Sequence, residues 1–185
     1  MKTSRFQFYS KQDLLKIFQE LDQDIALQKE KVEITLLGGA AIILQDFKAR
    51  ATQDIDIIPK AKGLTLFLDL CKKKGIQTQV ISILSTVDFD QLDPKEIYHG
   101  EFLKVNALSS TDLIKSKLER FFKQDPEDIY AMIEKDHIAY DDFKDLVQEM
   151  LADFVGEKKW LVLNARTVVE TVFPENGDDF YKSIK

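Results

Sequence analysis

The sequence predicts an α+β fold: a mixed α/β core followed by a helical C-terminal region. Two observations support this prediction. Up to about residue 108, short apolar or β-branched runs alternate with helical patterns, whereas beyond it the apolar residues recur at helical spacing. We therefore expect a core in residues 1–108, beginning with an N-terminal helix, and a helical region in residues 109–185 that packs on it.

The elements of the predicted core follow from the spacing of their apolar residues. Residues 11–31 have amphipathic helical spacing, and residues 32–37 are an apolar run typical of a buried strand. Further core elements are predicted as helices over 40–44, after the turn at 38–39, and over 64–74, and as strands over the run from 54 that ends at 59, over 76–84 and over 101–108. Residues 85–100 contain turn-forming sequences, so we expect an irregular connection there.

The C-terminal region has helical periodicity through most of its length. Helices are predicted over 110–123, 126–136, 141–155 and 159–173. Asp125 precedes Pro126, and Asp128 stands where the acid of a capping box would, so we expect both carboxylates to cap a helix. The final segment, 174–185, is acidic and contains a glycine, and we expect it to be loose or bound to a partner.

Composition excludes several classes of protein. The net charge of −6 and the isoelectric point near 5.1 argue against an extended nucleic-acid-binding surface. The apolar stretches are too short to span a bilayer and the N-terminus lacks a secretory hydrophobic region, so we expect a cytoplasmic protein without membrane contacts. His99 and His137 have no partner spacing typical of a zinc site or a Ser-His-Asp triad.

Asp54 and Asp56 are the strongest candidates for metal ligands. The string Asp-x-Asp recurs in a helical pattern and in a polar loop, so the string alone carries little information. Here, however, the two aspartates alternate with isoleucines in a run typical of a strand. Alternation places both carboxylates on one strand face, with Cα atoms about 7 Å apart. Because neighbouring carboxylates repel each other, a divalent cation would stabilise the pair, and open oxygen sites suit Mg²⁺ or Mn²⁺.

Gly38-Gly39 lies between the apolar strand and the helix that follows it. A glycine turn at a helix start presents backbone N–H groups and the positive end of the helix dipole to an anion. Alternatively, the glycine pair only turns a strand into a helix. Lys48 and Arg50 precede the strand of Asp54, and they either face a triphosphate or lie on the surface.

Lys117 lies on the apolar side of the first predicted C-terminal helix, between Leu113 and Phe121. A lysine in such a position must extend its ammonium to solvent or meet an anion. That anion is either a structural carboxylate or a phosphate of a bound nucleotide, for which lysine is a suitable partner.

Taken together, these motifs resemble the minimal nucleotidyltransferases of the polymerase-β superfamily, in which a glycine pair opens a helix and a D-x-D strand follows. The chain is most similar to a bacterial branch near the AbiEii-type toxins of abortive-infection systems. The matching residues are Leu37-Gly38-Gly39-Ala40-Ala41 and Arg50, Thr52, Asp54 and Asp56, with a second match over 108–118.

The resemblance implies transfer of a nucleoside monophosphate from an NTP to an acceptor, which is an RNA, a protein or a small molecule. Asp54 and Asp56 would be the catalytic pair that holds Mg²⁺ or Mn²⁺. The implied nucleotide contacts are Gly38 and Gly39, for the β- and γ-phosphates, and Arg50, Thr52 or Lys117. A cognate toxin or antitoxin is a further partner that the resemblance implies.

The chain departs from this family pattern at the third carboxylate, which the resemblance places on a neighbouring strand. The next predicted strand contains no acid, and the replacement candidates are Asp88, Asp90 and Glu101. Asp88 and Asp90 are better interpreted as part of a solvated loop. Two alternatives therefore stay open: a non-catalytic protein of this fold, acting as a nucleotide sensor or toxin–antitoxin component, and an unrelated α/β binding domain.

Overall fold

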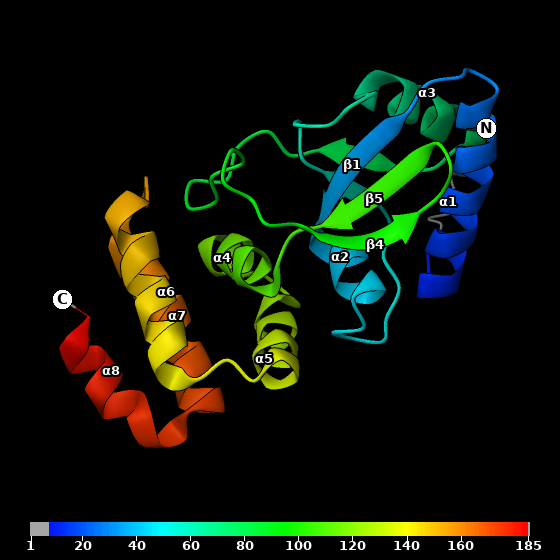
Figure 1. The fold of residues 1–185 in the computed structure, drawn as a ribbon. Helices are drawn as coiled ribbons and strands as arrows, with labels where there is room; N and C mark the ends of the chain where they lie inside the picture. The colour runs from blue at the N-terminus through cyan, green and yellow to red at the C-terminus, as the bar shows by residue number, and fades with distance from the viewer. Residues whose placement is uncertain (1–7, 185) are drawn as a thin grey trace, which may run out of the picture. The chain divides into compact units, whose positions relative to one another are not determined.

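The structure, a computed structural model, describes residues 8–184. Residues 1–7, which belong to the N-terminal stretch considered above, and Lys185 lie outside the described part. The chain forms two compact units (Figure 1). Of the described residues, one unit comprises 8–82 together with Gln91–Ser109, and the other comprises Ile83–Asp90 and 110–184. The first unit contains a mixed β-sheet with helices and the second is mainly helical, so the predicted α+β class is confirmed.

The sheet of the first unit has the strand order β3-β2-β1-β5-β4. Its strands are β1 (Val32–Leu37), β2 (Ile55–Ile57), β3 (Thr78–Val80), β4 (Lys95–His99) and β5 (Leu103–Ala107). Strand β1 is central, pairing parallel to β5 and antiparallel to β2. Strand β3 runs parallel to β2, and β4 runs antiparallel to β5. The sheet is therefore mixed, as the sequence predicts.

Three helices accompany this sheet: α1 (Lys11–Ala26), α2 (Gly38–Leu44) and α3 (Leu64–Lys74). Helix α1 begins with a capping box, in which Ser10 and Asp13 each accept a hydrogen bond from the other's backbone N–H. It buries an apolar stripe at helical spacing, made of Leu14, Phe18, Leu21 and Ile25. The ring of Phe18 lies 5.8 Å from that of Tyr98 on β4. Helix α1 therefore covers the sheet face to which Tyr98 belongs.

The opposite face of the sheet carries polar side chains. Strand β1 alternates Glu33 and Thr35 with buried isoleucine and leucine, and these two residues pair with Lys104 and Asn106 of β5. Because successive side chains of a strand point to opposite faces, these four side chains share one face. On the same face, Leu37 at the end of β1 pairs with Asp56 of β2. The candidate metal ligands therefore belong to the polar face.

Three predictions about elements of the first unit need correction. Helix α1 ends at Ala26 rather than at residue 31, and the chain leaves it through Lys29, which has a φ of 56°. The strand predicted over 76–84 is limited to Thr78–Val80. The connection predicted over 85–100 contains β4, which forms by pairing with β5. Strand pairing decided the limits of β3 and β4, and it leaves no local periodicity to read.

The second unit consists of helices joined by short connections. These are α4 (Ser110–Arg120), α5 (Asp125–Asp136), α6 (Tyr140–Asp153), α7 (Lys158–Val172), the 3₁₀ helix η1 (Pro174–Asn176) and α8 (Gly177–Ser183). Helix α4 packs against α5, α6 and α7. The segment 83–90 is attached to α4 because the Glu119 carboxylate accepts a hydrogen bond from the Thr86 N–H at 2.6 Å. None of the helices within residues 8–184 has the length and apolarity needed to cross a membrane.

The prediction that the last segment is loose was wrong for its described part. Residues 174–183 form η1 and α8, and both contact α7. Phe180 is fully buried, and the Arg166 guanidinium lies over the Tyr181 ring, 5.1 Å from its centroid. Acidic composition suggested solvation, but one aromatic side chain at a helical position supplies enough apolar area to hold the segment.

Candidate functional site

Asp54 and Asp56 lie at strand β2, where the sequence predicts them. Asp56 is the middle residue of β2, and Asp54 directly precedes the strand. Both are partly exposed, whereas the alternating Ile55 and Ile57 are buried. At about 6.6 Å per two strand residues, the two aspartates point to one face with their Cα atoms within reach of a common ligand.

The turn at Gly38 fits tightly against the Asp56 carboxylate. Gly38 has a φ of +64°, a left-handed conformation that disfavours residues with a Cβ. A Cβ at this position would collide with Oδ2 of Asp56. Glycine is therefore required here for both its conformation and its size, and the backbone of the turn directly approaches a candidate metal ligand.

Gly39 makes a comparable approach to Thr52 and Arg50. A Cβ on Gly39 would lie 2.7 Å from the Thr52 hydroxyl oxygen and 3.6 Å from an Nη atom of Arg50. The Thr52 hydroxyl is also 3.2 Å from the Asp54 carbonyl oxygen and 3.4 Å from Oδ1 of Asp54. The structure thus brings six of the seven predicted site residues together within the first unit: Gly38, Gly39, Arg50, Thr52, Asp54 and Asp56.

Thr52 is held in place from the N-terminal side. Its backbone forms two hydrogen bonds with Tyr9, at 2.7 and 3.0 Å, and its side chain is buried. Tyr9 is itself only 1% exposed. This isolated bridge fixes the loop that leads into β2, and so it orients the residues that contact Gly39. Sequence reasoning missed Tyr9, because the residue belongs to no periodic element.

Three further polar residues of this face were also missed. Gln79 of β3 is the register partner of Asp56, so its side chain points to the same face. Thr35 and Asn106, partners across β1 and β5, are only 6% and 4% exposed. For Thr35 and Asn106, a polar residue within a largely buried strand is a usable sequence signal, because buried polar groups need hydrogen-bonding partners.

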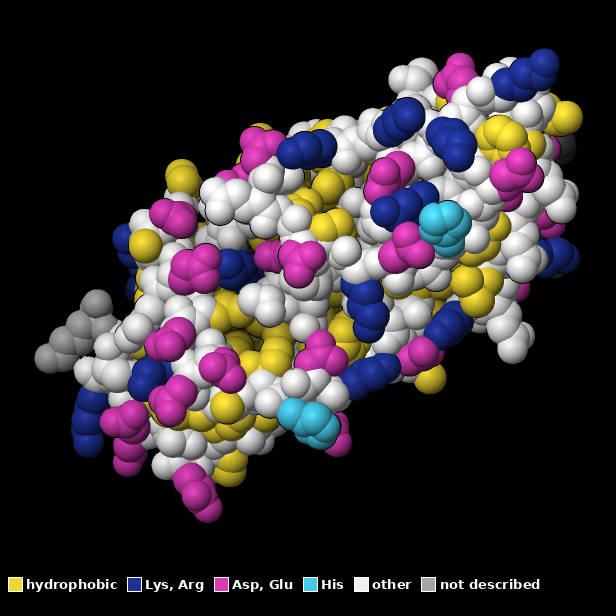
Figure 2. Space-filling view, viewed as in Figure 1, with side chains coloured by type: hydrophobic (Ala, Val, Ile, Leu, Met, Phe, Trp, Pro, Cys, Tyr) yellow, Lys and Arg dark blue, Asp and Glu magenta, His cyan; other side chains and the backbone are white. Residues whose placement is uncertain are grey.

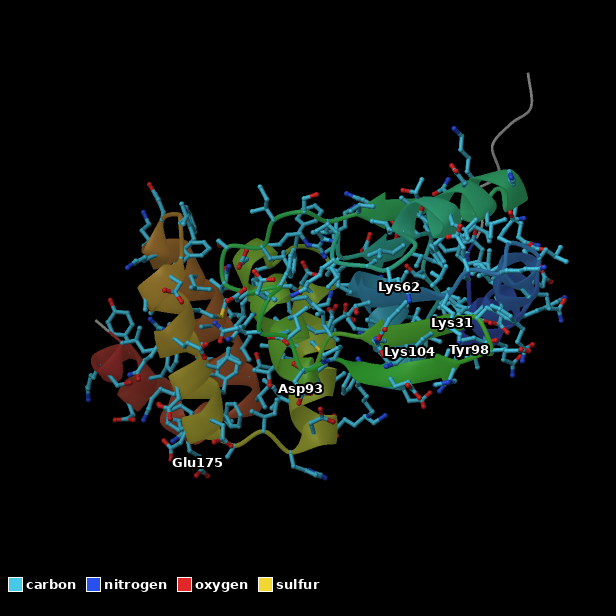
Figure 3. The ribbon with its side chains drawn as sticks, turned by 45° about the horizontal axis from the view of Figure 1, so that its top comes forward. Lys31, Lys62, Asp93, Tyr98, Lys104 and Glu175 are labelled. Atoms are coloured by element: carbon cyan, nitrogen blue, oxygen red, sulfur yellow. The ribbon has the colours of Figure 1, made fainter. Side chains whose placement is uncertain are left out.

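Glu33 begins a charged row farther along the same face. Its carboxylate accepts a hydrogen bond from the Asn106 amide at 2.9 Å and lies 3.1 Å from the Lys104 ammonium. These contacts, with a weaker contribution from Lys62, hold the pKa of Glu33 below its ordinary value. Figure 3 labels Lys62 and Lys104 beside the sheet. The negative charge of Glu33 is balanced by its neighbours in this row, so we do not assign Glu33 to the metal site.

The candidates for a third carboxylate are Glu101, in the first unit, and Asp88 and Asp90, in the second unit. Glu101 is in the turn before β5, which starts opposite Val32, whereas Asp56 pairs with the last residue of β1. At about 3.3 Å per residue, the length of β1 separates the two by roughly 17 Å. Asp88 and Asp90 are exposed in a loop in which the Asp90 N–H donates to Oδ1 of Asp88 at 2.8 Å, which confirms the solvated-loop interpretation.

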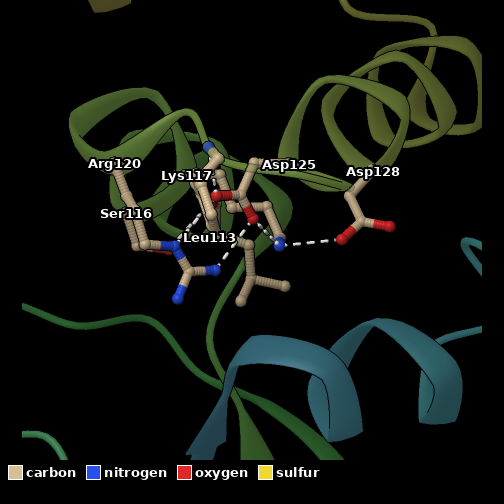
Figure 4. Close-up of polar contacts among 7 residues, drawn as sticks. Leu113, Ser116, Lys117, Arg120, Asp125 and Asp128 are labelled. Carbon is tan, nitrogen blue, oxygen red and sulfur yellow. Dashed lines mark hydrogen bonds and ion pairs between the residues drawn. The ribbon is translucent and has the colours of Figure 1, made fainter. Parts of the chain in front are cut away.

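Lys117 belongs to the second unit, where its ammonium lies 2.8 Å from both Asp125 and Asp128 (Figure 4). Only 3% of the lysine is exposed, and the two aspartates are equally buried. Of the two anions considered for Lys117, its observed contacts are therefore with structural carboxylates. Its role toward a nucleotide stays a prediction.

The capping roles predicted for Asp125 and Asp128 were wrong. The residue that precedes helix α5 is Gln124, and no side chain caps the helix start. Asp125 instead accepts hydrogen bonds from Arg120, Lys117 and the Phe122 N–H. Burial alone would raise the pKa of Asp125, but Arg120 and Lys117 lower it to about 2. The carboxylates were needed to compensate a buried lysine from a neighbouring helix.

A divalent cation fits the donor set at β2. Within residues 8–184, His, Cys, Asp and Glu side chains form no group of three or more that could hold a metal ion. The protein thus offers two carboxylates, Asp54 and Asp56, and leaves other ligand positions to water or substrate oxygens. Mg²⁺ is commonly bound in this way, by one or two carboxylates and the phosphates of a substrate.

A mixed sheet with a glycine turn packed against an Asp-x-Asp strand defines a nucleotidyltransferase-like fold. A family model described as "Nucleotidyltransferase of unknown function (DUF6036)" matches residues 12–171, and the chain belongs to this family. No curated protein and no solved structure matches the chain. The family supports the nucleotidyltransferase assignment in general terms.

Proposed function

We propose that this protein transfers a nucleoside monophosphate from an NTP to an acceptor, with Mg²⁺ or Mn²⁺ bound at Asp54 and Asp56. The observation that carries the proposal is the close approach of the Gly38 turn to the Asp56 carboxylate. This approach would bring phosphates at the glycine turn next to a cation on the carboxylate pair, which membership of a nucleotidyltransferase family also favours.

Each residue of the site has a definite task in this proposal. A bound cation would neutralise phosphate charge and orient the α-phosphate. The backbone N–H groups at Gly38 and Gly39 bind the β- and γ-phosphates, and Arg50 pairs with a phosphate oxygen through its planar guanidinium. Thr52 orients Asp54 through its hydroxyl. The acceptor oxygen attacks the α-phosphorus in line, the bond to the bridging oxygen breaks and pyrophosphate leaves, so that positioning supplies most of the rate.

A label-transfer assay tests this function. The purified protein is incubated with each α-labelled NTP, Mg²⁺ or Mn²⁺, and cellular RNA, protein extract or small-molecule extract as acceptor. We expect transfer that is abolished in the double variant Asp54→Asn/Asp56→Asn. The matched control is Asp88→Asn/Asp90→Asn, which removes two carboxylates at the same spacing from an exposed loop. Transfer that survives the first variant would refute the site, and absence of both transfer and metal–NTP binding would refute the function.

One observation favours a second candidate function, that of a nucleotide sensor without turnover. The strand position beside Asp56 is occupied by Gln79 rather than by an acid. Two carboxylates suffice to bind a metal–nucleotide complex, whereas in-line displacement is most efficient with two cations about 4 Å apart. A sensor would bind metal–NTP with the same dependence on Asp56 but transfer no label to any acceptor.

The finer predictions belong to this proposal as well. The AbiEii-type branch, a cognate toxin or antitoxin, and a cytoplasmic location stay predictions. The same applies to the expected lack of an extended nucleic-acid surface. On the face drawn in Figure 2, acidic and basic side chains are interspersed, which is compatible with that expectation. Identification of the labelled acceptor would test the prediction of a cognate toxin or antitoxin.

A further inference from the structure

Strand β3 is one edge of the sheet, and its outer side has no neighbouring strand within residues 8–184. On its inner side, β2 donates a hydrogen bond to the Gln77 carbonyl at 3.0 Å and accepts one from the Ile81 N–H at 2.9 Å. Because the backbone groups of successive strand residues point alternately to the two sides, the N–H and C=O groups of Thr78 and Val80 point outward. These groups form a row of donors and acceptors with which another extended strand can pair.

The two edges of the sheet differ in sequence. Strand β4, the other edge, begins with Lys95 and Glu96, and its register is irregular between Glu96 and Tyr98. Charged residues and bulges are features by which proteins prevent a sheet edge from pairing with another chain. Residues 76–82, which include β3, contain no charged residue and no proline, and β-branched side chains are frequent among them. Strand β3 therefore has the composition of an edge that accepts a further strand.

A groove of about 510 Å³ lies beside this edge, between β3 and helix α3. Its lining includes Leu68 on α3, Ile76 just before β3, and Thr78 and Val80 on β3. Thr78 and Val80 lie two residues apart, so their side chains share the face of the sheet that α3 covers. A strand added outside β3 would point every second side chain to the same face, and the groove would receive those that are apolar.

The charges beside the groove favour an acidic partner. Lys72 and Asp69 belong to the lining, and Lys73 is exposed next to Lys72. The two lysines lie in the last turn of α3, so positive charge exceeds negative charge at the end of the groove formed by Gly75. Carboxylates at one end of a bound strand would complement these lysines.

We propose that β3 binds an extended acidic segment of a partner protein, which joins the sheet as a further strand and places apolar side chains in the groove beside α3. Backbone hydrogen bonds supply the affinity, and the groove with its lysines supplies the selectivity, as in other complexes in which a peptide adds to a sheet edge. The added strand lies two strand spacings, about 10 Å, from β2. Its residue opposite Gln79 points to the polar face that Gln79 shares with Asp56, so the partner is held beside the candidate active site.

Binding of a synthetic peptide tests this proposal. The probe is the fluorescein-labelled peptide Thr-Val-Thr-Val-Glu-Glu, and its controls are the same peptide with methylated backbone nitrogens and a version that ends in Lys-Lys. Fluorescence anisotropy measures the affinity, and we expect both controls to bind at least about tenfold more weakly than the probe. Hydrogen exchange measured by NMR should show that the probe protects the Thr78 and Val80 N–H groups. The Ile81 N–H is already bonded to β2, so its exchange should not change.

Two pairs of variants test the protein side of the contact. Val80→Pro removes an outward N–H but leaves the hydrogen bonds to β2 intact, and proline is tolerated at such edge positions. It should weaken binding of the probe about three- to tenfold, whereas Val80→Thr keeps both the N–H and the β-branched shape and should bind within about twofold of wild type. Lys72→Gln/Lys73→Gln should also weaken binding about three- to tenfold. Lys29→Gln/Lys31→Gln makes the same charge change on the connection between α1 and β1 and should leave the affinity unaltered.

Equal affinity of the N-methylated and unmodified peptides would overturn the proposal, because strand addition requires the N–H groups of the peptide. This comparison uses the wild-type protein, so it stays decisive if Val80→Pro does not fold. Absence of probe binding, or binding without protection of Thr78 and Val80, would overturn the proposal as well. Protection that rises with protein concentration in the absence of peptide would show that a second copy of the chain occupies the edge instead. None of these measurements depends on nucleotide transfer, so this proposal and the proposed function can fail separately.

Discussion

Replacement of Gly38 by alanine should lower both the stability of the protein and its affinity for metal–nucleotide. Gly38 has a φ of +64°, and an alanine in this left-handed region costs about 1–2 kcal/mol. The new Cβ would also collide with the Asp56 carboxylate, and forced displacement of a packed group costs about 1–3 kcal/mol more. The free energy of unfolding should therefore fall by about 2–5 kcal/mol. Because the displaced group is a proposed metal ligand, metal–NTP affinity should fall at least about tenfold.

Gly75 provides a matched control for this experiment. It has a φ of +72°, nearly the same conformation, but a Cβ added there would have no atom within 4 Å. Gly75→Ala should cost only the backbone term, about 1–2 kcal/mol, and should leave nucleotide binding unchanged. Urea unfolding measures the stabilities and calorimetry measures binding. Equal stability losses in the two variants, with unaltered metal–NTP affinity in Gly38→Ala, would refute the reasoning that links the turn to Asp56.

Three further predictions follow from contacts in the two units. The pKa of Asp125 is held at about 2, below its ordinary 3.8, so its ionised form contributes about 2 kcal/mol of stability above pH 4 that is lost as the pH falls through about 2. The urea unfolding free energies of wild type and Asp125→Asn should therefore converge toward pH 2. A constant difference between the two would contradict this. Asp22 accepts hydrogen bonds from three consecutive backbone N–H groups at the β4–β5 turn, at 2.6 to 3.2 Å, so Asp22→Asn should cost about 1–3 kcal/mol of unfolding free energy. Asp24→Asn, which removes a partly exposed 2.9 Å pair with a lysine, should cost about 1 kcal/mol or less, and comparable losses would refute the role of the turn. Gln79→Glu should strengthen Mn²⁺ binding about tenfold by adding a carboxylate next to Asp56. The control Gln28→Glu on the exposed surface should leave Mn²⁺ affinity unchanged, and titration with Mn²⁺ distinguishes the two.

The candidate site was largely predictable because its signals are local. A glycine pair between an apolar strand and a helix, and two aspartates alternating with isoleucines, are patterns of a few residues that need no distant partner to be recognised. The structure brings Gly38 against Asp56 and Gly39 against Thr52, in agreement with the expected proximity of the two motifs. Gln79 and Tyr9 escaped prediction because only the strand register and an isolated bridge place them there.

The second unit gives the opposite example. Asp125 and Asp128 have the spacing of a capping motif, which is a local signal, but a buried lysine on the preceding helix competes for both carboxylates. An unpaired buried ammonium costs far more than a missing cap, so the ion pairs decide the geometry. No spacing rule relates Lys117 to these residues across the turn between α4 and α5. The same limitation applies to Phe180, whose burial depends on packing against other helices.

The sequence by itself determined the α+β class, the order of most elements and the identity of the carboxylate strand with its glycine turn. These features follow from hydrophobic periodicity and from the conformational freedom of glycine, which act over a few neighbouring residues. Only the tertiary structure decided that β4 joins the sheet, that residues 83–90 belong with the helical unit, that Lys117 meets two aspartates, and that Lys11 shares a pocket with Lys48 and Arg50. Each of these depends on pairing or burial between segments that meet only in the folded chain, which local periodicity does not reveal.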